Sequence, residues 1–198
     1  MKSNQEASTT FLSKRKLRKE IREKRDSIKI TDRKKISKII AEKFFKTGFY
    51  TGSDKILAYY PFGSEIDTAI IIRRALKNNK KIILPKVYGR ELKLYYVNKL
   101  SEQLEKGKYG ILEPISSLCR PAGVKDIDLA VIPGLGFDKD LNRLGYGKGF
   151  FDRFLRLLPE EVKKIALCFD VQVIGNIPVS EYDIKIDLLI TESRTYRS

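Results

Sequence analysis

The chain has 198 residues, of which 42% are hydrophobic and 33% are charged, a composition typical of a globular protein that buries its own core. Histidine is absent, which excludes a Ser-His-Asp or Cys-His nucleophile system and any histidine-ligated metal. The net charge is +15, and residues 1–50 hold 16 Lys and Arg against 6 Asp and Glu, so a basic N-terminal arm is available to bind an anionic partner.

Cysteine usage and the lack of long apolar segments predict a cytoplasmic protein. Cys119 and Cys168 are far apart and form no CxxC pair, which argues against a disulfide framework or a zinc site and is typical of a reducing compartment. No apolar core of a secretory signal follows the first lysine, and no apolar stretch approaches the roughly 18 residues of a membrane helix.

The N-terminal quarter is predicted to form two basic helices. Residues 1–10 are polar and aperiodic, and we expect residues 1–12 to be a mobile tail. From Ser13 onward apolar residues recur at helical spacing, and lysines and arginines cover the remaining faces. The second helix is bounded by cap and turn residues, namely Thr31 or Asp32 at its start and Gly48 and Gly52 at its end. We therefore expect residues 13–50 to form a helical arm packed on the sheet of a single domain, residues 1–198.

After residue 50 the pattern changes to short apolar runs that predict buried strands. The strands are expected at residues 55–60, 81–84, 128–132, 164–169 and 186–191, and the helices at residues 69–78 and 149–158. Residues 92–97 alternate and predict a strand nearer an edge, while Pro85 is expected to end the strand before it and Asp67 or Thr68 to cap the next helix. Buried strands alternating with helices predict an α/β fold with a mostly parallel sheet flanked by helices.

A glycine-rich segment at residues 142–153 is the strongest candidate for chemistry. Its alternate glycines let backbone amides approach an anion closely, and the helix that follows presents its positive end. Arg143 and Lys148 add mobile positive charge of the kind that phosphoryl transfer needs, and Asp152 is a possible Mg²⁺ ligand. The segment lacks both the P-loop pattern and the GxGxxG order, and a plain turn with a surface lysine is the alternative.

Two further loops carry candidate site residues. In the loop after the first strand, Tyr60 and Phe62 can stack on a flat heterocycle and Glu65 can bind its ring nitrogens, although a strand-to-helix turn explains the same residues. In the polar loop at residues 178–183, Asp183 can supply a second metal ligand, although an ordinary polar loop is the alternative. The glycines of residues 133–137 also permit close backbone approach, and a plain turn explains them equally well.

Together these segments resemble the 5-formyltetrahydrofolate cyclo-ligase family, also called 5,10-methenyltetrahydrofolate synthetases. Order and spacing are kept from about residue 13 to residue 192. The segments that carry the resemblance are residues 14–18, 60–68, 84–86, 110–114, 133–138 and 143–153, with Asp183 and Asp187 near the end. The chain departs from many relatives at Tyr182, where they have histidine.

The resemblance implies an α/β sandwich like that of sugar-phosphate isomerases and coenzyme A transferases, and an ATP- and Mg²⁺-dependent ring closure. The formyl oxygen of 5-formyltetrahydrofolate takes the terminal phosphoryl group of ATP, nitrogen 10 attacks the activated carbon, and phosphate leaves. ADP, phosphate and 5,10-methenyltetrahydrofolate are the products. We expect a monomer that binds the folate, with or without a polyglutamate tail, and ATP, and we expect neither a membrane nor nucleic acid as its partner.

The resemblance also assigns site residues. ATP is expected to contact Lys14, Arg15, Lys16, Leu17, Arg18, Arg143, Leu144, Gly145, Tyr146, Gly147, Lys148, Gly149, Phe150 and Phe151. The folate is expected to contact Tyr60, Glu65, Tyr146, Gly147, Lys148, Gly149 and Phe150, and magnesium is expected to bind Asp152 and Asp183. Lys148 and Arg143 are the expected catalytic residues, and replacing either of them or Asp152 by alanine is predicted to lower turnover with little loss of folding.

Two other functions are compatible with parts of the sequence. A nucleic-acid-binding module would use the basic arm, and its binding would weaken steeply with salt. An isomerase or transferase of the same general fold would use a catalytic carboxylate and would need no ATP.

Overall fold

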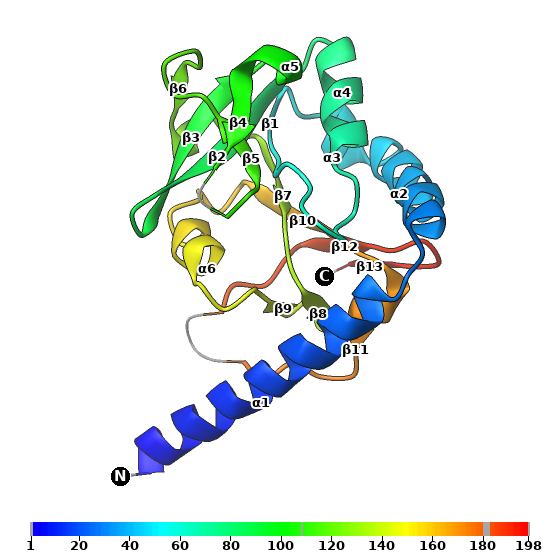
Figure 1. The fold of residues 1–198 in the computed structure, drawn as a ribbon, viewed down its shortest axis with the longest axis vertical. Helices are drawn as coiled ribbons and strands as arrows, with labels where there is room; N and C mark the ends of the chain where they lie inside the picture. The colour runs from blue at the N-terminus through cyan, green and yellow to red at the C-terminus, as the bar shows by residue number, and fades with distance from the viewer. Residues whose placement is uncertain (1, 108, 180–182, 198) are drawn as a thin grey trace.

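The computed structural model describes residues 2–107, 109–179 and 183–197. Its centre is an eight-stranded sheet of order β13-β12-β10-β7-β1-β2-β3-β6 (Figure 1). The strands from β12 to β2 are parallel, and the outer strands β13, β3 and β6 are antiparallel to their neighbours. The bounds are β1 (Lys55–Leu57), β2 (Lys81–Tyr88), β3 (Glu91–Val97), β6 (Pro121–Ala122), β7 (Leu129–Ile132), β10 (Lys163–Leu167), β12 (Leu188–Ile190) and β13 (Thr195–Arg197). The predicted α/β fold with a mostly parallel sheet is confirmed.

Helices cover both faces of this sheet. The helices are α1 (Lys2–Asp26), α2 (Ile30–Phe45), α3 (Gly48–Thr51), α4 (Ala69–Lys77), α5 (Leu100–Gln103) and α6 (Phe150–Leu155), with short 3-10 turns at Val124–Asp126 and Asp170–Gln172. Alternate strand residues such as Ile56 and Ile82 pack with α2, α3 and α4, whereas Leu57 and Ile83 pack with α6. Among the described residues, no helix combines the length and the apolar character that crossing a membrane requires.

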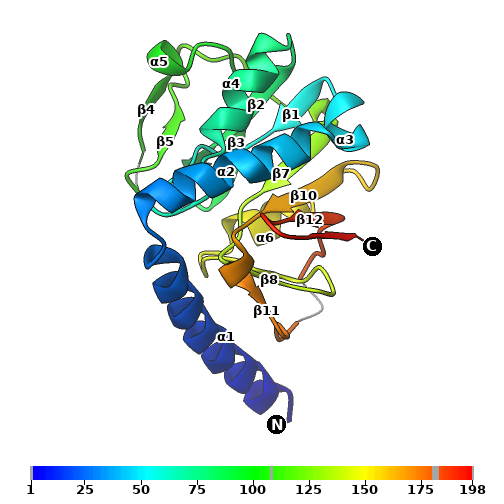
Figure 2. The same cartoon turned by 90° about the vertical axis from the view of Figure 1, so that its right-hand side faces the viewer.

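Two small sheets complete the fold. One contains β8 (Gly136–Asp138), β9 (Arg143–Leu144) and β11 (Val173–Ile174), and the other pairs β4 (Leu104–Lys106) with β5 (Leu112–Pro114). Figures 1 and 2 show α1 running beside the β8–β9–β11 sheet while its N-terminal end projects away from the rest of the fold. Ile21, which is 1% exposed, anchors α1 in a cluster with Leu135, Leu144 and Ile177. Of the predicted arm, α2 and α3 therefore pack on the large sheet, whereas α1 packs beside the β8–β9–β11 sheet.

The helix boundaries in the arm differ from the sequence prediction. The first helix begins at Lys2 and not at Ser13, so it includes the segment predicted as a tail. The second begins at Ile30 with Lys29 at its N-cap, because Lys29 is extended and the chain is already helical at Thr31 and Asp32. Asp32 instead lies in the first turn, where a carboxylate favours the helix. This helix ends at Phe45, before the predicted glycines, which bound the separate short helix α3.

The predicted end of the second strand at Pro85 is wrong. Strand β2 continues to Tyr88, and Pro85 pairs with Leu94 of β3. The backbone N–H of Val87 points to the Glu113 carboxylate and away from β3, and N–H groups two residues apart point to the same side of a strand. The missing N–H of Pro85 therefore faces the side where β1 has already ended, so the proline breaks no ladder hydrogen bond.

The helix after the glycine-rich segment is also shorter than predicted. It covers only Phe150–Leu155, and single turns follow it before Pro159. Helix α4 agrees with the prediction of residues 69–78 to within one residue, and Asp67 provides the side-chain cap by accepting a hydrogen bond from the Ala69 backbone N–H. Strand β3 is separated from the edge only by the two-residue strand β6, which confirms its predicted place near an edge.

Replacing Gly134 by alanine is expected to destabilise the fold by about 1–3 kcal/mol. An alanine Cβ would lie 2.3 Å from Cζ of Phe137, a ring that is completely buried and has no room to move aside. Urea unfolding of Gly134→Ala should therefore show a lower midpoint than the wild type. Gly175→Ala is the matched control, because its Cβ meets nothing within 4 Å. Equal midpoints for Gly134→Ala and the wild type would contradict the packing role of this glycine.

Candidate active site

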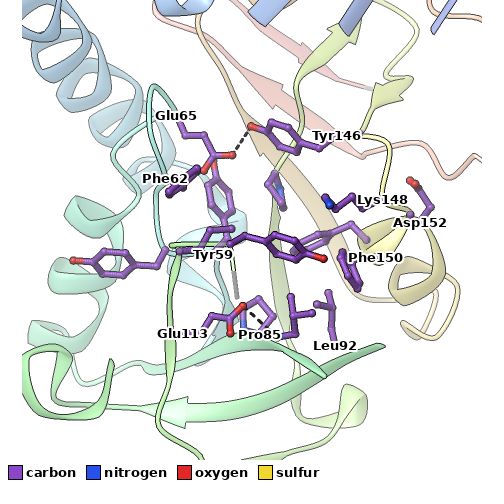
Figure 3. Close-up of a pocket in the computed structure, with 18 of the residues that line it drawn as sticks. Tyr59, Phe62, Glu65, Pro85, Leu92, Glu113, Tyr146, Lys148, Phe150 and Asp152 are labelled. Carbon is purple, nitrogen blue, oxygen red and sulfur yellow. Dashed lines mark hydrogen bonds between the residues drawn. The ribbon is translucent and has the colours of Figure 1, made fainter. Parts of the chain in front are cut away.

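A pocket of about 300 Å³ lies beyond the carboxyl ends of β1 and β7, where ligands bind in open parallel sheets (Figure 3). Its walls are mostly aromatic and aliphatic and come from the loop after β1, the end of β2, the segment before β5, and the start of α6. Tyr60 and Glu65 line it together with Arg143, Lys148 and Asp152. The structure thus brings the glycine-rich segment at residues 142–153 and the loop after the first strand together in one cavity.

On one side of the pocket, Glu65 and Tyr146 are joined by a hydrogen bond in which the tyrosine hydroxyl donates (Figure 3). The other carboxylate oxygen of Glu65 accepts from the Phe62 backbone N–H at 3.0 Å. Burial raises the pKa of Glu65, and these two hydrogen bonds and the charge of Arg25 oppose that rise. Burial, together with the nearby Glu65 charge, also raises the pKa of Tyr146, so this hydroxyl stays protonated and remains a donor.

On the other side of the pocket, Arg143 and Asp152 form an ion pair. The Arg143 side chain is 4% exposed, and its Nη1 donates to the carbonyl of Pro133 at 3.1 Å. Its Nε is buried without a hydrogen-bond partner among the described residues. Burial lowers the pKa of Arg143, and the charges of Asp152 and Asp183 counteract that shift. The guanidinium is thus held rigidly at the pocket wall.

Lys148 differs from Arg143 because it is exposed and makes few fixed contacts. Its ammonium lies 4.3 Å from the centroid of the Tyr109 ring, and that ring lies 6.2 Å from the ring of Phe150. A positive charge on a flexible stem at the pocket mouth is suited to follow an anionic group that moves during a reaction.

A buried carboxylate fixes the turn that leads into the glycine-rich segment. Asp138 is 0% exposed and accepts backbone N–H hydrogen bonds from Asp140, Asn142 and Ile177 at 2.9–3.0 Å. It also accepts from the Asn142 side-chain amide at 2.9 Å. These four hydrogen bonds offset the cost of burying the charge and place Arg143 at the start of β9.

Two glycines of the segment have backbone conformations that favour glycine. Gly147 (φ 93°) and Gly149 (φ 70°) are left-handed, a conformation that other residues rarely adopt. The Arg18 side chain packs 3.4 Å from where a Gly147 Cβ would lie, and its Nε donates to the Gly145 carbonyl at 2.9 Å. The loop therefore contacts α1 directly and does so through its backbone.

The N-terminal arm presents only part of its predicted ATP site to the loop. Arg18, Leu17 and Lys14 are half-buried on one face of α1, and Lys14 forms an ion pair with Asp183 at 2.6 Å. Arg15 and Lys16 lie on the opposite face and are exposed, and Lys16 pairs with Glu20 at 3.9 Å. Helical geometry separates the two groups, because residues three and four apart share a face while their immediate neighbours do not.

Asp152 and Asp183, the predicted magnesium ligands, approach the same positive groups. The charges of both carboxylates act against the lowering of the pKa of Arg18 and of Arg143, so both carboxylates lie near these two arginines. Within the described ranges no group of three or more Cys, Asp or Glu side chains is arranged as a metal site. Residues 180–182, including Tyr182, lie outside the described residues.

Sequence reasoning missed several residues of the site. Arg22 of α1 and Glu113 of β5 line the pocket, and Arg25 of α1 is buried behind it. A signal was present for Arg25, which falls on the same helical face as Arg18 and Ile21. For Glu113, burial raises the pKa, and its carboxylate packs against Gly107, a contact that residue spacing does not reveal.

Comparison with known proteins identifies the family. The model of the 5-formyltetrahydrofolate cyclo-ligase family matches residues 11–192. The chain belongs to this family. It is 31% identical over 196 residues to mouse 5-formyltetrahydrofolate cyclo-ligase, a match that covers 94% of this chain and 97% of that relative. The family and the enzyme class predicted from the sequence are thereby confirmed.

Solved structures agree with this family assignment. The NMR structure of Aquifex aeolicus 5,10-methenyltetrahydrofolate synthetase matches with a TM-score of 0.83 at 32% identity, covering 93% of this chain and 92% of that chain. A 5,10-methenyltetrahydrofolate synthetase from Mycoplasma pneumoniae matches with a TM-score of 0.72 at 26% identity, covering 90% of this chain and 98% of that chain. The predicted fold is therefore shared over nearly the whole chain.

Proposed function

We propose that this cyclo-ligase family member converts 5-formyltetrahydrofolate and ATP into 5,10-methenyltetrahydrofolate, ADP and phosphate in a Mg²⁺-dependent reaction. The formyl oxygen attacks the terminal phosphorus of ATP and ADP leaves. Nitrogen 10 of the same folate then attacks the activated carbon and loses its proton, and the carbon–oxygen bond breaks to release phosphate. The nucleophiles belong to the substrate, so the absence of histidine is no obstacle to this chemistry.

The observation that carries the proposal is the joining of two chemically different sides in one pocket. Tyr60, Phe62 and Phe150 offer aromatic surface for a flat pterin, and Glu65 offers a partly buried carboxylate for its N–H groups. In the same pocket, Arg143 and Lys148 supply positive charge where the phosphoryl group would move. An intramolecular ring closure needs this kind of alignment more than it needs a protein nucleophile.

For ATP, the glycine-rich segment and α1 are the proposed contacts. Lys14, Leu17 and Arg18 already meet this segment or Asp183, so a nucleotide bound there would lie between the helix and the loop. Arg15 and Lys16 are exposed and would need a change in the helix or a long reach to touch the same ligand. We therefore assign the main nucleotide contacts of the arm to its inner face.

For magnesium, Asp152 and Asp183 fit the ligand preference of a hard cation that takes one or two carboxylates and completes its shell with phosphate oxygens and water. Both carboxylates are paired with cationic side chains, Arg143 and Lys14, and both lie near Arg18. When bound, the ion would neutralise phosphate charge. Arg143 would then remain at the pocket wall through its bond to Pro133.

An omission experiment tests the function. Incubation with 5-formyltetrahydrofolate, ATP and Mg²⁺ is expected to produce the absorbance of the methenyl product, and omission of any one component should abolish it. Product formed without ATP would contradict the proposal and would favour an isomerase or transferase of the same fold. Salt-sensitive binding of nucleic acid that is lost on deleting residues 1–30 would favour the nucleic-acid alternative instead.

We further propose a monomer that acts in the cytoplasm. Both cysteines, Cys119 and Cys168, are free and buried, which is consistent with a reducing compartment. The inner basic residues of α1 contact the glycine-rich segment and the Asp183 loop, which favours a bound nucleotide over nucleic acid as the partner of this helix face.

A further inference from the structure

Helix α1 buries an arginine in its last turn, behind the pocket. Arg25 is 5% exposed, although its neighbours Lys24 and Asp26 are exposed. Burying a guanidinium costs free energy unless its donors are satisfied, so its partners show what holds it there. Its Nε donates to Ser64 Oγ at 2.9 Å, and its Nη1 donates to the Tyr146 hydroxyl at 2.7 Å.

These bonds continue into the folate side of the pocket. Tyr146 accepts from Arg25 and donates to Glu65, so the three side chains form one directed chain of hydrogen bonds. The Arg25 guanidinium also lies 5.7 Å from the centroid of the Tyr146 ring. The second branch of the network is equally complete, because Ser64 accepts from Arg25 and donates to Asp26.

We propose that Arg25 is a positioning residue for the folate, which fixes Tyr146 and Glu65 in the geometry that binds the pterin. The inference rests on the proposed function, since it assumes that the folate occupies this side of the pocket. Arg25 lines no part of the cavity itself and acts through the two residues that do. Its charge also favours the ionised form of Glu65, the form that accepts hydrogen bonds from ring N–H groups.

The same helix connects the folate side with the proposed nucleotide side. Lys14, Arg18 and Arg25 lie at helical spacing on the inner face of α1 and contact, in turn, Asp183, Gly145 and Tyr146. The network that orients the folate residues is therefore mounted on the helix whose inner face meets the glycine-rich segment. The position of α1 sets the geometry of both sides at once.

The test compares Arg25→Gln and Arg25→Lys with Lys24→Gln, which removes one exposed positive charge from the same helical turn and is the matched control. Arg25→Gln is expected to raise the KM for 5-formyltetrahydrofolate roughly tenfold or more, the loss typical of a charge-assisted hydrogen bond, while the KM for ATP changes much less. Arg25→Lys keeps the charge and should recover part of the loss. Lys24→Gln should behave like the wild type.

The pH dependence separates positioning from mere structural support. The charged and titratable groups around Glu65 are Arg25, Tyr59 and Tyr146, and Arg25 lowers the pKa of the Glu65 carboxyl. Loss of the Arg25 charge should therefore move the acid limb of kcat/KM for the folate to higher pH, because Glu65 would then be protonated at a higher pH. A lower melting temperature with unchanged KM and pH profile would overturn the proposal.

Tyr146→Phe keeps the inference testable if Arg25→Gln fails to fold. It removes the hydroxyl that joins Arg25 to Glu65 but leaves every charge in place, so it should raise the KM for the folate in the same direction. In the double variant with Arg25→Lys, the fold-increase in the KM for the folate should be smaller than the product of the two single fold-increases. A fold-increase equal to that product would overturn the proposal. Wild-type protein without cyclo-ligase activity would instead contradict the proposed function, and calorimetric binding of 5-formyltetrahydrofolate would then decide the role of Arg25 separately.

Discussion

Replacement of Lys148 by alanine should lower kcat for the cyclo-ligase reaction by roughly 100- to 1000-fold, the usual loss when one group that stabilises transition-state charge is removed. Lys148 is exposed at the mouth of the pocket, and its contact in the structure is with the face of the Tyr109 ring. Such an exposed cation–π contact is worth only about 0.5–1 kcal/mol, so the free energy of unfolding should hardly change. We therefore expect Lys148→Ala to lower turnover strongly and to leave the stability of the fold nearly unchanged.

Initial rates of methenyl product formation and a thermal melt of Lys148→Ala test this expectation. Lys139→Ala is the matched control, because Lys139 is an exposed lysine in the turn between β8 and β9 and does not line the pocket. Wild-type turnover in Lys148→Ala would remove this residue from the reaction. A parallel fall in the melting temperature would instead indicate that the lysine supports the fold.

Arg143 does not share this behaviour, and the sequence prediction about it needs correction. The glycine-rich context predicts an accessible charge whose loss leaves folding intact. The structure instead buries Arg143, ties it to Pro133 and pairs it with Asp152, so Arg143→Ala should cost about 1–3 kcal/mol of stability in addition to activity. The difference arises because β9 turns the arginine inward, which residue type and local spacing do not reveal.

Sequence patterns predicted the sheet well where burial alone decides the structure. The runs around Ile56, Ile82, Ala130 and Ala166 are apolar on both faces. Such continuous apolar runs are typical of strands that are covered on both sides. Prediction failed where a tertiary neighbour relaxes a local rule. Pro85 continues a strand because β1 ends beside it, and Thr31 lies inside a helix because the preceding Lys29 already takes the cap position.

The residues of the candidate site also fall into those that sequence patterns predict and those that depend on tertiary neighbours. Glycine spacing, charge and family resemblance predicted the residues that surround the pocket, and the structure places Tyr60, Glu65, Arg143, Lys148 and Asp152 there. The network behind the pocket could not be predicted, because Arg25 and Tyr146 are 121 residues apart in sequence and no local pattern links them. Helical phase separates the inner from the outer basic residues of α1, but which face points inward depends on the packing of Ile21.

Replacement of Asp183 by asparagine should raise the Mg²⁺ concentration needed for half-maximal activity by roughly 10- to 100-fold, the scale of loss seen even when supporting residues of a metal site are removed. Asparagine keeps the size of the side chain and one oxygen but removes the charge that a hard cation prefers. The ion pair with Lys14 would also be lost, and because both side chains are partly exposed, that loss should cost little stability.

Initial rates measured against free Mg²⁺ at saturating ATP, together with equilibrium binding of Mn²⁺ as a probe, distinguish a metal ligand from a residue that only holds α1. Asp140→Asn is the matched control, since Asp140 is exposed on the turn between β8 and β9. Asp152→Asn should shift the Mg²⁺ requirement in the same direction but should also lose stability, because it leaves the buried Arg143 without its carboxylate. An unchanged Mg²⁺ requirement in both variants would exclude these carboxylates as magnesium ligands, and the contacts of Asp183 with Lys14 and of Asp152 with Arg143 would then serve only to fasten α1 and the glycine-rich segment to the fold.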